Sequence, residues 1–123
     1  MVLITSNKYQ RLLCLRYVQR VSADELVKTR DELKALLSEL PSGFRLLVDM
    51  SQLESMDPDS LTELGANMDL VGQHGVGLVV RVIPHATQDI GFNIMSVFHY
   101  PHETRTITCQ TAAEALRQLA LWA

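Results

Sequence analysis

Three aspartates stand where a predicted strand gives way to a predicted helix, and they are the first candidates for chemistry. Asp49 lies near the end of an apolar run, and Asp57 and Asp59 flank Pro58 at the next helical pattern. Ligands of open α/β sheets bind at this carboxyl edge. The carboxylate oxygens of the three aspartates would suit a divalent cation. A receiver-type phosphoacceptor site would also need further acidic ligands and a lysine after other strands, and both are missing. We expect no metal site here, and a helix start with Asp57 as its N-cap is the structural alternative to a binding role.

The other reactive side chains form no catalytic set. The sequence has no Gly-x-Ser-x-Gly elbow, and the glycines of 72–77 lack the lysine of a phosphate-binding loop. The four histidines have no Cys or acidic partner at zinc-site spacing. Cys14 and Cys109 lie inside strand-like segments, where we expect reduced, apolar side chains. We therefore predict a protein that is not an enzyme and that carries no cofactor.

Composition limits the class of protein further. The chain has 123 residues, of which 47% are hydrophobic, and a net charge of -3, which predicts one globular domain over residues 1–123. The net negative charge and the lack of a run of Lys and Arg residues argue against nucleic-acid binding. No apolar run approaches the roughly 20 residues of a membrane span, and the first residues lack the basic start of a signal peptide. We expect a cytoplasmic protein.

Strand-like and helix-like segments alternate along the chain, which predicts an α/β fold with a mixed, mostly parallel sheet. The predicted strands cover 2–5, 11–17, 44–50, 78–83 and 105–109, and the first two should form a hairpin. The predicted helices cover 22–40, 57–72, 84–98 and a stretch from 111 onward. Capping boxes at Ser22–Glu25 and Thr111–Glu114 mark two of the helix starts. Leu116 and Leu119 are expected to face the core from the last helix.

The predicted helix over 84–98 has more apolar positions than one buried face requires. Phe92 and Met95 lie away from the main apolar stripe of this helix. Either the helix is deeply buried or irregular around Gly91, or Phe92 and Met95, together with Tyr100, form a patch for a partner. The same face would also suit a second copy of the chain, or the lining of a cavity for an apolar ligand.

One segment resembles a known family. Residues 44–61 read FRLLVDMSQLESMDPDSL, followed by a helix, a glycine-rich turn, a valine-rich strand and a proline. This order is similar to that of the STAS domain, in which a hydrophobic strand leads into Asp-Leu-Ser and then Asp-Ser-Ser-Gly-Leu. The resemblance spans roughly Tyr9 to Leu119. It implies a STAS-like sheet with helices mainly on one face, and a role like that of bacterial anti-sigma-factor antagonists.

The sequence departs from the family pattern at the position that is phosphorylated in the family. Asp57 matches the family Asp, Pro58 replaces the first Ser, Asp59 replaces the phosphoacceptor Ser, and Ser60 replaces the Gly. In the family, a kinase that is also an anti-sigma factor phosphorylates that serine, and the partner is released. Asp59 carries a charge but no hydroxyl, so we expect no phosphorylation here, except on Ser60 in a shifted register.

We therefore predict a non-catalytic protein–protein interaction module in bacterial regulation, whose partner is a regulatory protein such as an anti-sigma-type kinase. The predicted partner-binding residues are Asp57, Asp59, Ser60, Leu61, Phe92 and Met95. The alternatives are an assembly protein that forms a homodimer and a protein that binds a small apolar ligand or lipid, both through the face around Phe92 and Met95.

Overall fold

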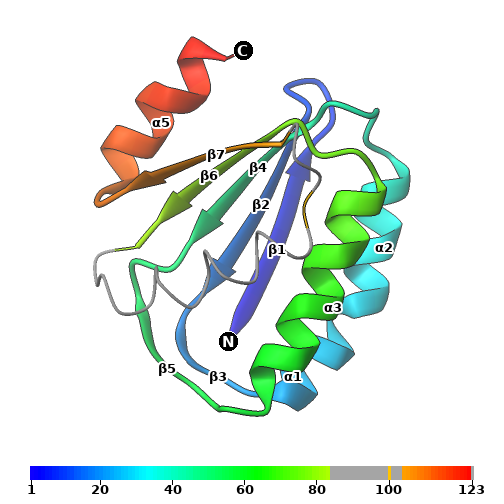
Figure 1. The fold of residues 1–123 in the computed structure, drawn as a ribbon, viewed down its shortest axis with the longest axis vertical. Coiled ribbons are helices and arrows are strands. Elements are labelled where there is room, and N and C mark those ends of the chain that lie inside the picture. The colour runs from blue at the N-terminus through cyan, green and yellow to red at the C-terminus, as the bar shows by residue number, and fades with distance from the viewer. Residues whose placement is uncertain (84–99, 101–103, 123) are drawn as a thin grey trace.

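The computed structural model describes residues 1–83, 100 and 104–122, and Figure 1 shows their arrangement. The strands are β1 (Val2–Asn7), β2 (Leu12–Tyr17), β3 (Gln19–Val21), β4 (Arg45–Asp49), β5 (Leu53–Met56), β6 (Leu78–Val82) and β7 (Arg105–Cys109). The helices are α1 (Ala23–Lys28), α2 (Arg30–Ser38), α3 (Ser60–Gln73) and α5 (Ala112–Leu121). The predicted helix over 84–98, with Phe92 and Met95, lies outside the described residues.

The main sheet has five strands in the order β1-β2-β4-β6-β7. Strands β1 and β2 pair antiparallel, with Val2 opposite Tyr17, which confirms the predicted hairpin. The other three pairings are parallel. All five residues of β6 are buried, as expected for a strand covered on both faces. The predicted mixed, mostly parallel sheet is thus confirmed.

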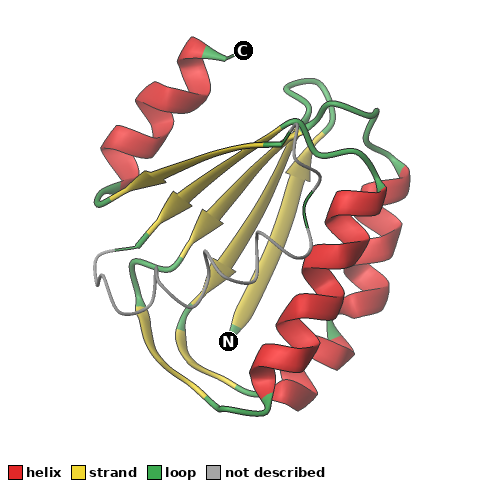
Figure 2. Cartoon of the chain, viewed as in Figure 1, coloured by secondary structure: helices red, strands yellow, loops and turns green. Residues whose placement is uncertain are grey.

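Helices cover the two faces of this sheet unequally. Figure 2 shows α1, α2 and α3 on one side of the sheet and α5 on the other. Side chains alternate along β6, so that Val79 joins the larger core under α1–α3 while Val80 joins a smaller core under α5. The predicted placement of most helices on one face is therefore confirmed. In α5 only part of the prediction holds, because Leu119 is buried but Leu116 is 61% exposed.

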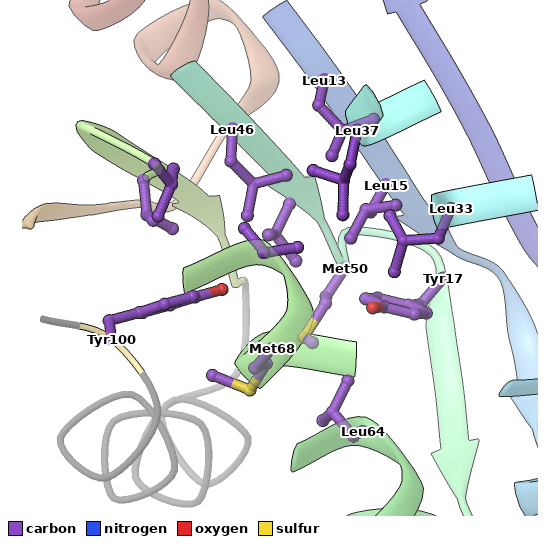
Figure 3. Close-up of a cluster of buried hydrophobic side chains, with 14 of the residues drawn as sticks. Leu13, Leu15, Tyr17, Leu33, Leu37, Leu46, Met50, Leu64, Met68 and Tyr100 are labelled. Atoms are coloured by element: carbon purple, nitrogen blue, oxygen red, sulfur yellow. The ribbon is translucent and has the colours of Figure 1, made fainter. Parts of the chain in front are cut away.

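The larger core contains two buried tyrosines, Tyr17 and Tyr100. Figure 3 shows both rings among apolar side chains that include Met50 and Met68. Burial is the main cause that raises the pKa of each hydroxyl well above its usual range, so both tyrosines stay neutral. Of the two alternatives for this stretch, the one that puts Tyr100 in an exposed patch does not hold for Tyr100, because only 8% of this residue is exposed.

The helix predicted over 22–40 is interrupted at Thr29, between α1 and α2. Ser22 caps α1 as expected, accepting a hydrogen bond from the Glu25 amide at 3.3 Å. The Thr29 hydroxyl donates to the Glu25 carbonyl at 2.9 Å, and threonines that bond back along a helix in this way bend it. The Glu25 carboxylate does not complete the capping box but accepts from the Val2 amide at 2.6 Å, which ties α1 to β1.

Strands β3 and β5 are absent from the sequence-based prediction. They pair in parallel as a separate two-stranded sheet, with Val21 opposite Met56. Each is too short for a period-two pattern to stand out, and the central residues of β5, Glu54 and Ser55, are both exposed. This small sheet carries the chain from the main sheet to the start of α3.

Candidate functional site

The start of α3 is built on the end of β3. The Val21 carbonyl accepts from the Asp57 amide at 3.2 Å and from the Ser60 hydroxyl at 3.3 Å. The Ser60 amide in turn donates to the Asp57 carbonyl at 2.9 Å, which closes a tight turn before the helix. The helix therefore begins at Ser60 and not at Pro58, and the predicted capping role of Asp57 is wrong.

Asp57 has a different partner, Arg20 of β3. Arg20 donates from Nε to Oδ1 at 3.1 Å and from Nη2 to Oδ2 at 3.2 Å, so the guanidinium binds both carboxylate oxygens. This paired geometry fixes the direction of both side chains. It explains why the Asp57 carboxylate is not free to cap the helix, since Arg20 holds it toward β3.

Buried and exposed residues alternate at the first turn of α3. Asp59 occupies the position before the helix and is exposed, and its side chain makes no capping hydrogen bond. Ser60 is 0% exposed, whereas the next residue, Leu61, is 48% exposed although its spacing from Leu64 and Met68 fits an apolar stripe. A carboxylate at a helix N-terminus is favoured by the helix dipole. The turn thus presents a negative charge and an apolar side chain to solvent, with the hydroxyl of Ser60 turned inward.

A partly buried polar cluster fixes α3 against the α1–α2 junction. Arg30 donates from Nη2 to the Glu63 carboxylate at 2.6 Å and from Nε to Asn67 Oδ1 at 2.8 Å. Asn67 is buried, and its amide group donates to the Leu26 carbonyl at 3.3 Å. Sequence reasoning missed this cluster. Its one signal is Asn67 itself, a polar residue three positions after Leu64 on an otherwise apolar helix face.

Asp49 lies at the end of β4, within a different set of contacts. Its carboxylate pairs with Arg16 Nε at 3.5 Å and accepts from the Ser51 amide at 2.9 Å. Arg16 therefore pairs with Asp49, whereas Arg20 pairs with Asp57. Within the described ranges, no three His, Cys, Asp or Glu side chains gather as ligands for a metal ion.

The structure brings four of the six predicted partner-binding residues together. Asp57, Asp59, Ser60 and Leu61 share one turn, although Ser60 is buried beneath its surface. Phe92 and Met95 lie outside the described residues. Sequence reasoning missed Arg20 and Arg30, since each meets a partner 33 to 37 residues further along the chain. In the part of the chain that the structure covers, no helix is long and apolar enough to span a membrane.

The sequence matches no protein-family model and no curated protein. The fold, in contrast, matches solved structures along nearly the whole chain. The unphosphorylated anti-sigma factor antagonist SpoIIAA matches with a TM-score of 0.69 and 8% identity, covering 100% of both chains. An uncharacterised DUF3478-family protein from Shewanella loihica, described as SpoIIAA-like in fold, matches with a TM-score of 0.71 and 12% identity, covering 97% of this chain and 92% of that one.

A third match is an anti-sigma factor antagonist from Mycobacterium paratuberculosis, with a TM-score of 0.59 and 15% identity, covering 98% of this chain and 93% of that one. At such identities the likeness concerns the backbone arrangement. The five-stranded, mostly parallel sheet with α1–α3 on one face is the arrangement that these proteins share with it. The chain therefore has a STAS-like fold, the fold of the anti-sigma factor antagonist SpoIIAA.

Proposed function

We propose that the protein is a non-catalytic, cytoplasmic module of bacterial regulation that binds a protein partner at the start of α3. The observation that carries this proposal is the first turn itself. Exposed Asp59 and exposed Leu61 flank buried Ser60 on a turn that Arg20 and Arg30 hold in place. An aliphatic anchor beside a charged group on a rigid element meets the basic requirements of a protein-binding site. The fold shared with anti-sigma factor antagonists supports a regulatory role.

The chemistry of the turn describes the partner that it would fit. Asp59 is exposed, and Glu54 on the neighbouring β5 is exposed as well. A complementary surface would place a basic group opposite Asp59 and an apolar pocket around Leu61. An anti-sigma-type kinase is the kind of partner that the STAS resemblance of the sequence implies, and the fold shared with anti-sigma factor antagonists supports a regulatory protein as the partner.

The proposed module does not switch by serine phosphorylation. Asp59 stands directly before the first residue of α3, and its carboxylate carries a smaller charge than a phosphoserine would. The Ser60 hydroxyl is buried and donates to the Val21 carbonyl, so a kinase would have to open this turn to reach it. We infer that the protein stays in one binding state.

Affinity purification with quantitative mass spectrometry from cells that produce the protein tests the interface. The site variants are Asp59→Lys and Leu61→Glu, and the matched controls are Asp31→Lys in the first turn of α2 and Leu121→Glu on α5. We expect one regulatory protein to bind the wild type and both controls. Calorimetry with that purified protein should show at least about tenfold weaker binding to both site variants. Equal binding to all four variants would contradict the proposal.

A phosphorylation assay tests the single binding state separately. The captured partner, or a kinase purified with it, is incubated with ATP and Mg²⁺, and the intact mass of the protein is measured. We expect the wild-type mass to stay unchanged, and Asp59→Ser to gain one phosphate if the partner is a kinase of the anti-sigma type. A phosphate on Ser60 of the wild type would contradict the proposed constant state.

A further inference from the structure

A groove lies at the opposite end of the sheet from the start of α3. It has a volume of about 720 Å³, and its walls are the β1–β2 turn and the last turns of α5. Figure 1 shows these two segments near the end of the sheet at which β4 begins, whereas α3 starts at the other end. The volume falls in the range of roughly 300–1,000 Å³ that is common for ligand sites.

Two aromatic side chains are exposed among the described residues, and both line this groove. The chain has three Phe, three Tyr and one Trp. Tyr17, Phe44 and Tyr100 are buried, whereas Tyr9 is 92% exposed and Trp122 is 45% exposed. Tyr9 lies on one wall and Trp122 on the other. Such rings are typical anchors of binding surfaces, because they bury a large area and lose few rotamers on binding.

The charge of the groove is positive, in contrast to the net charge of -3 of the whole chain. Arg11 and Arg45 line it, and the guanidinium of Arg105 lies 4.2 Å from the centre of the Trp122 ring. None of the described lining residues is acidic. Across residues 1–83, 100 and 104–122, these three arginines form no ion pair with a carboxylate. The groove therefore favours an anionic occupant.

The two walls are held in place by Arg45 at the start of β4. It donates from Nη1 to the Leu119 carbonyl of α5 at 2.7 Å and from Nη2 to the Gln10 carbonyl of the β1–β2 turn at 2.6 Å. One side chain thus ties both walls to the central sheet. A groove held open in this way lowers the entropy cost of binding.

We propose that this groove binds an acidic peptide segment of a partner protein. An apolar or aromatic side chain of the peptide would lie between Tyr9 and Trp122, and its carboxylates would face Arg11 and Arg45. Recognition of acidic segments by arginine clusters is a recurring mode of peptide binding. Because Tyr9 stands almost fully exposed on its wall, the groove is open at its rim and suits a segment that passes across it. This site is separate from the α3 turn.

Selection from a library of short random peptides on the immobilised full-length protein tests this proposal. We expect enriched peptides to carry an aromatic residue flanked by Asp or Glu. Synthetic copies should shift the emission of Trp122, which is the one tryptophan of the chain and therefore reports on the groove. Binding should weaken with added salt, since the charges of the groove are partly exposed.

Matched variants assign the binding to the groove. Tyr9→Ala and Arg11→Gln should each lower the affinity roughly tenfold. Leu121→Ala and Arg117→Gln, on exposed α5 positions outside the lining, should leave it unchanged. Leu61→Glu should also have no effect, which separates this test from that of the α3 turn.

Three results would overturn the proposal. The first is that no peptide is enriched, or that the enriched peptides are basic or uncharged. The second is binding that survives both Tyr9→Ala and Arg11→Gln. The third is that free phenylacetate binds as tightly as the peptides, which would assign the groove to a small carboxylate.

Discussion

Arg20 binds both carboxylate oxygens of Asp57, with Nε–Oδ1 and Nη2–Oδ2 distances of 3.1 and 3.2 Å. This pair joins β3 to the turn before α3. Because Arg20 is 72% exposed, water screens the pair, and its energetic contribution is small. Its main effect is on direction, since it turns the Asp57 carboxylate away from the helix amides.

Removing this pair should change stability little. We expect Arg20→Gln and Asp57→Asn each to lower the free energy of unfolding by less than about 1 kcal/mol, and a double-mutant cycle to give a coupling of roughly 0.5 kcal/mol. Urea denaturation of the four proteins measures this. Partner binding at the α3 turn should fall in both variants, because the side chain at position 57 loses its fixed direction. Unchanged partner binding would show that the Arg20–Asp57 contact does not organise the site.

A charge at position 60 should destabilise the fold, whereas a change at position 59 should not. Ser60→Asp places a carboxylate in a fully buried position, and we expect it to lower the free energy of unfolding by at least about 2 kcal/mol. Position 59 is exposed, so Asp59→Ser should leave the free energy of unfolding within about 0.5 kcal/mol of the wild-type value. Thermal unfolding followed by circular dichroism compares the two. A stable, folded Ser60→Asp protein would mean that the turn opens easily.

The Arg30–Glu63–Asn67 cluster should contribute more to stability than the surface pair does. Asn67→Ala removes a buried acceptor of Arg30 and a buried donor to the Leu26 carbonyl. We expect a loss of about 1–3 kcal/mol in the free energy of unfolding, because the Leu26 carbonyl left behind is buried and the Arg30 guanidinium is partly buried. Lys34→Gln, on the exposed side of α2, is the matched control and should have little effect. Equal melting temperatures for the two variants would contradict a stabilising role for the cluster.

Alkaline pH should destabilise the protein through Tyr17 and Tyr100. Burial raises the pKa of both hydroxyls in the folded state, so the unfolded chain loses these protons first, above about pH 10. The unfolded state then binds fewer protons, and the free energy of unfolding falls by about 1.4 kcal/mol per pH unit for each tyrosine. Below the ordinary tyrosine pKa this stability is fully present.

Urea denaturation between about pH 9 and about pH 12 measures this slope. Tyr17→Phe and Tyr100→Phe should each make the decline less steep, whereas Tyr9→Phe, at an exposed position, should leave it as in the wild type. A decline that is identical in all four proteins would have another cause, such as the ionisation of lysines.

The main sheet could be predicted from the sequence because each of its strands has an apolar pattern within a few consecutive residues. The run 44–50 is nearly all apolar, and the alternation of Leu13, Leu15 and Tyr17 marks one face of β2. The hairpin, the parallel strands and the caps of α1 and α5 follow from such patterns, and the STAS resemblance followed from their order. These features depend on residues close together in the sequence.

The details of the α3 turn could not be predicted, because they depend on contacts between distant residues. Asp57 next to Pro58 is a common helix start, and Arg20, 37 residues earlier, overrides that local preference. Strands β3 and β5 are likewise defined by pairing with each other. Leu61 fits an apolar stripe by spacing, yet it is exposed in the first turn of α3. Local propensity alone contains no information on these partners.

The separation of the core into two clusters has a consequence for evolution. The cluster under α5 and the cluster under α1–α3 lie on opposite faces, and the sheet stands between them. Side-chain volume on one face can therefore change without repacking the other. The α3 turn rests on one cluster and the α5 groove on the other, so selection can reshape either surface in a lineage while the second keeps its ancestral form.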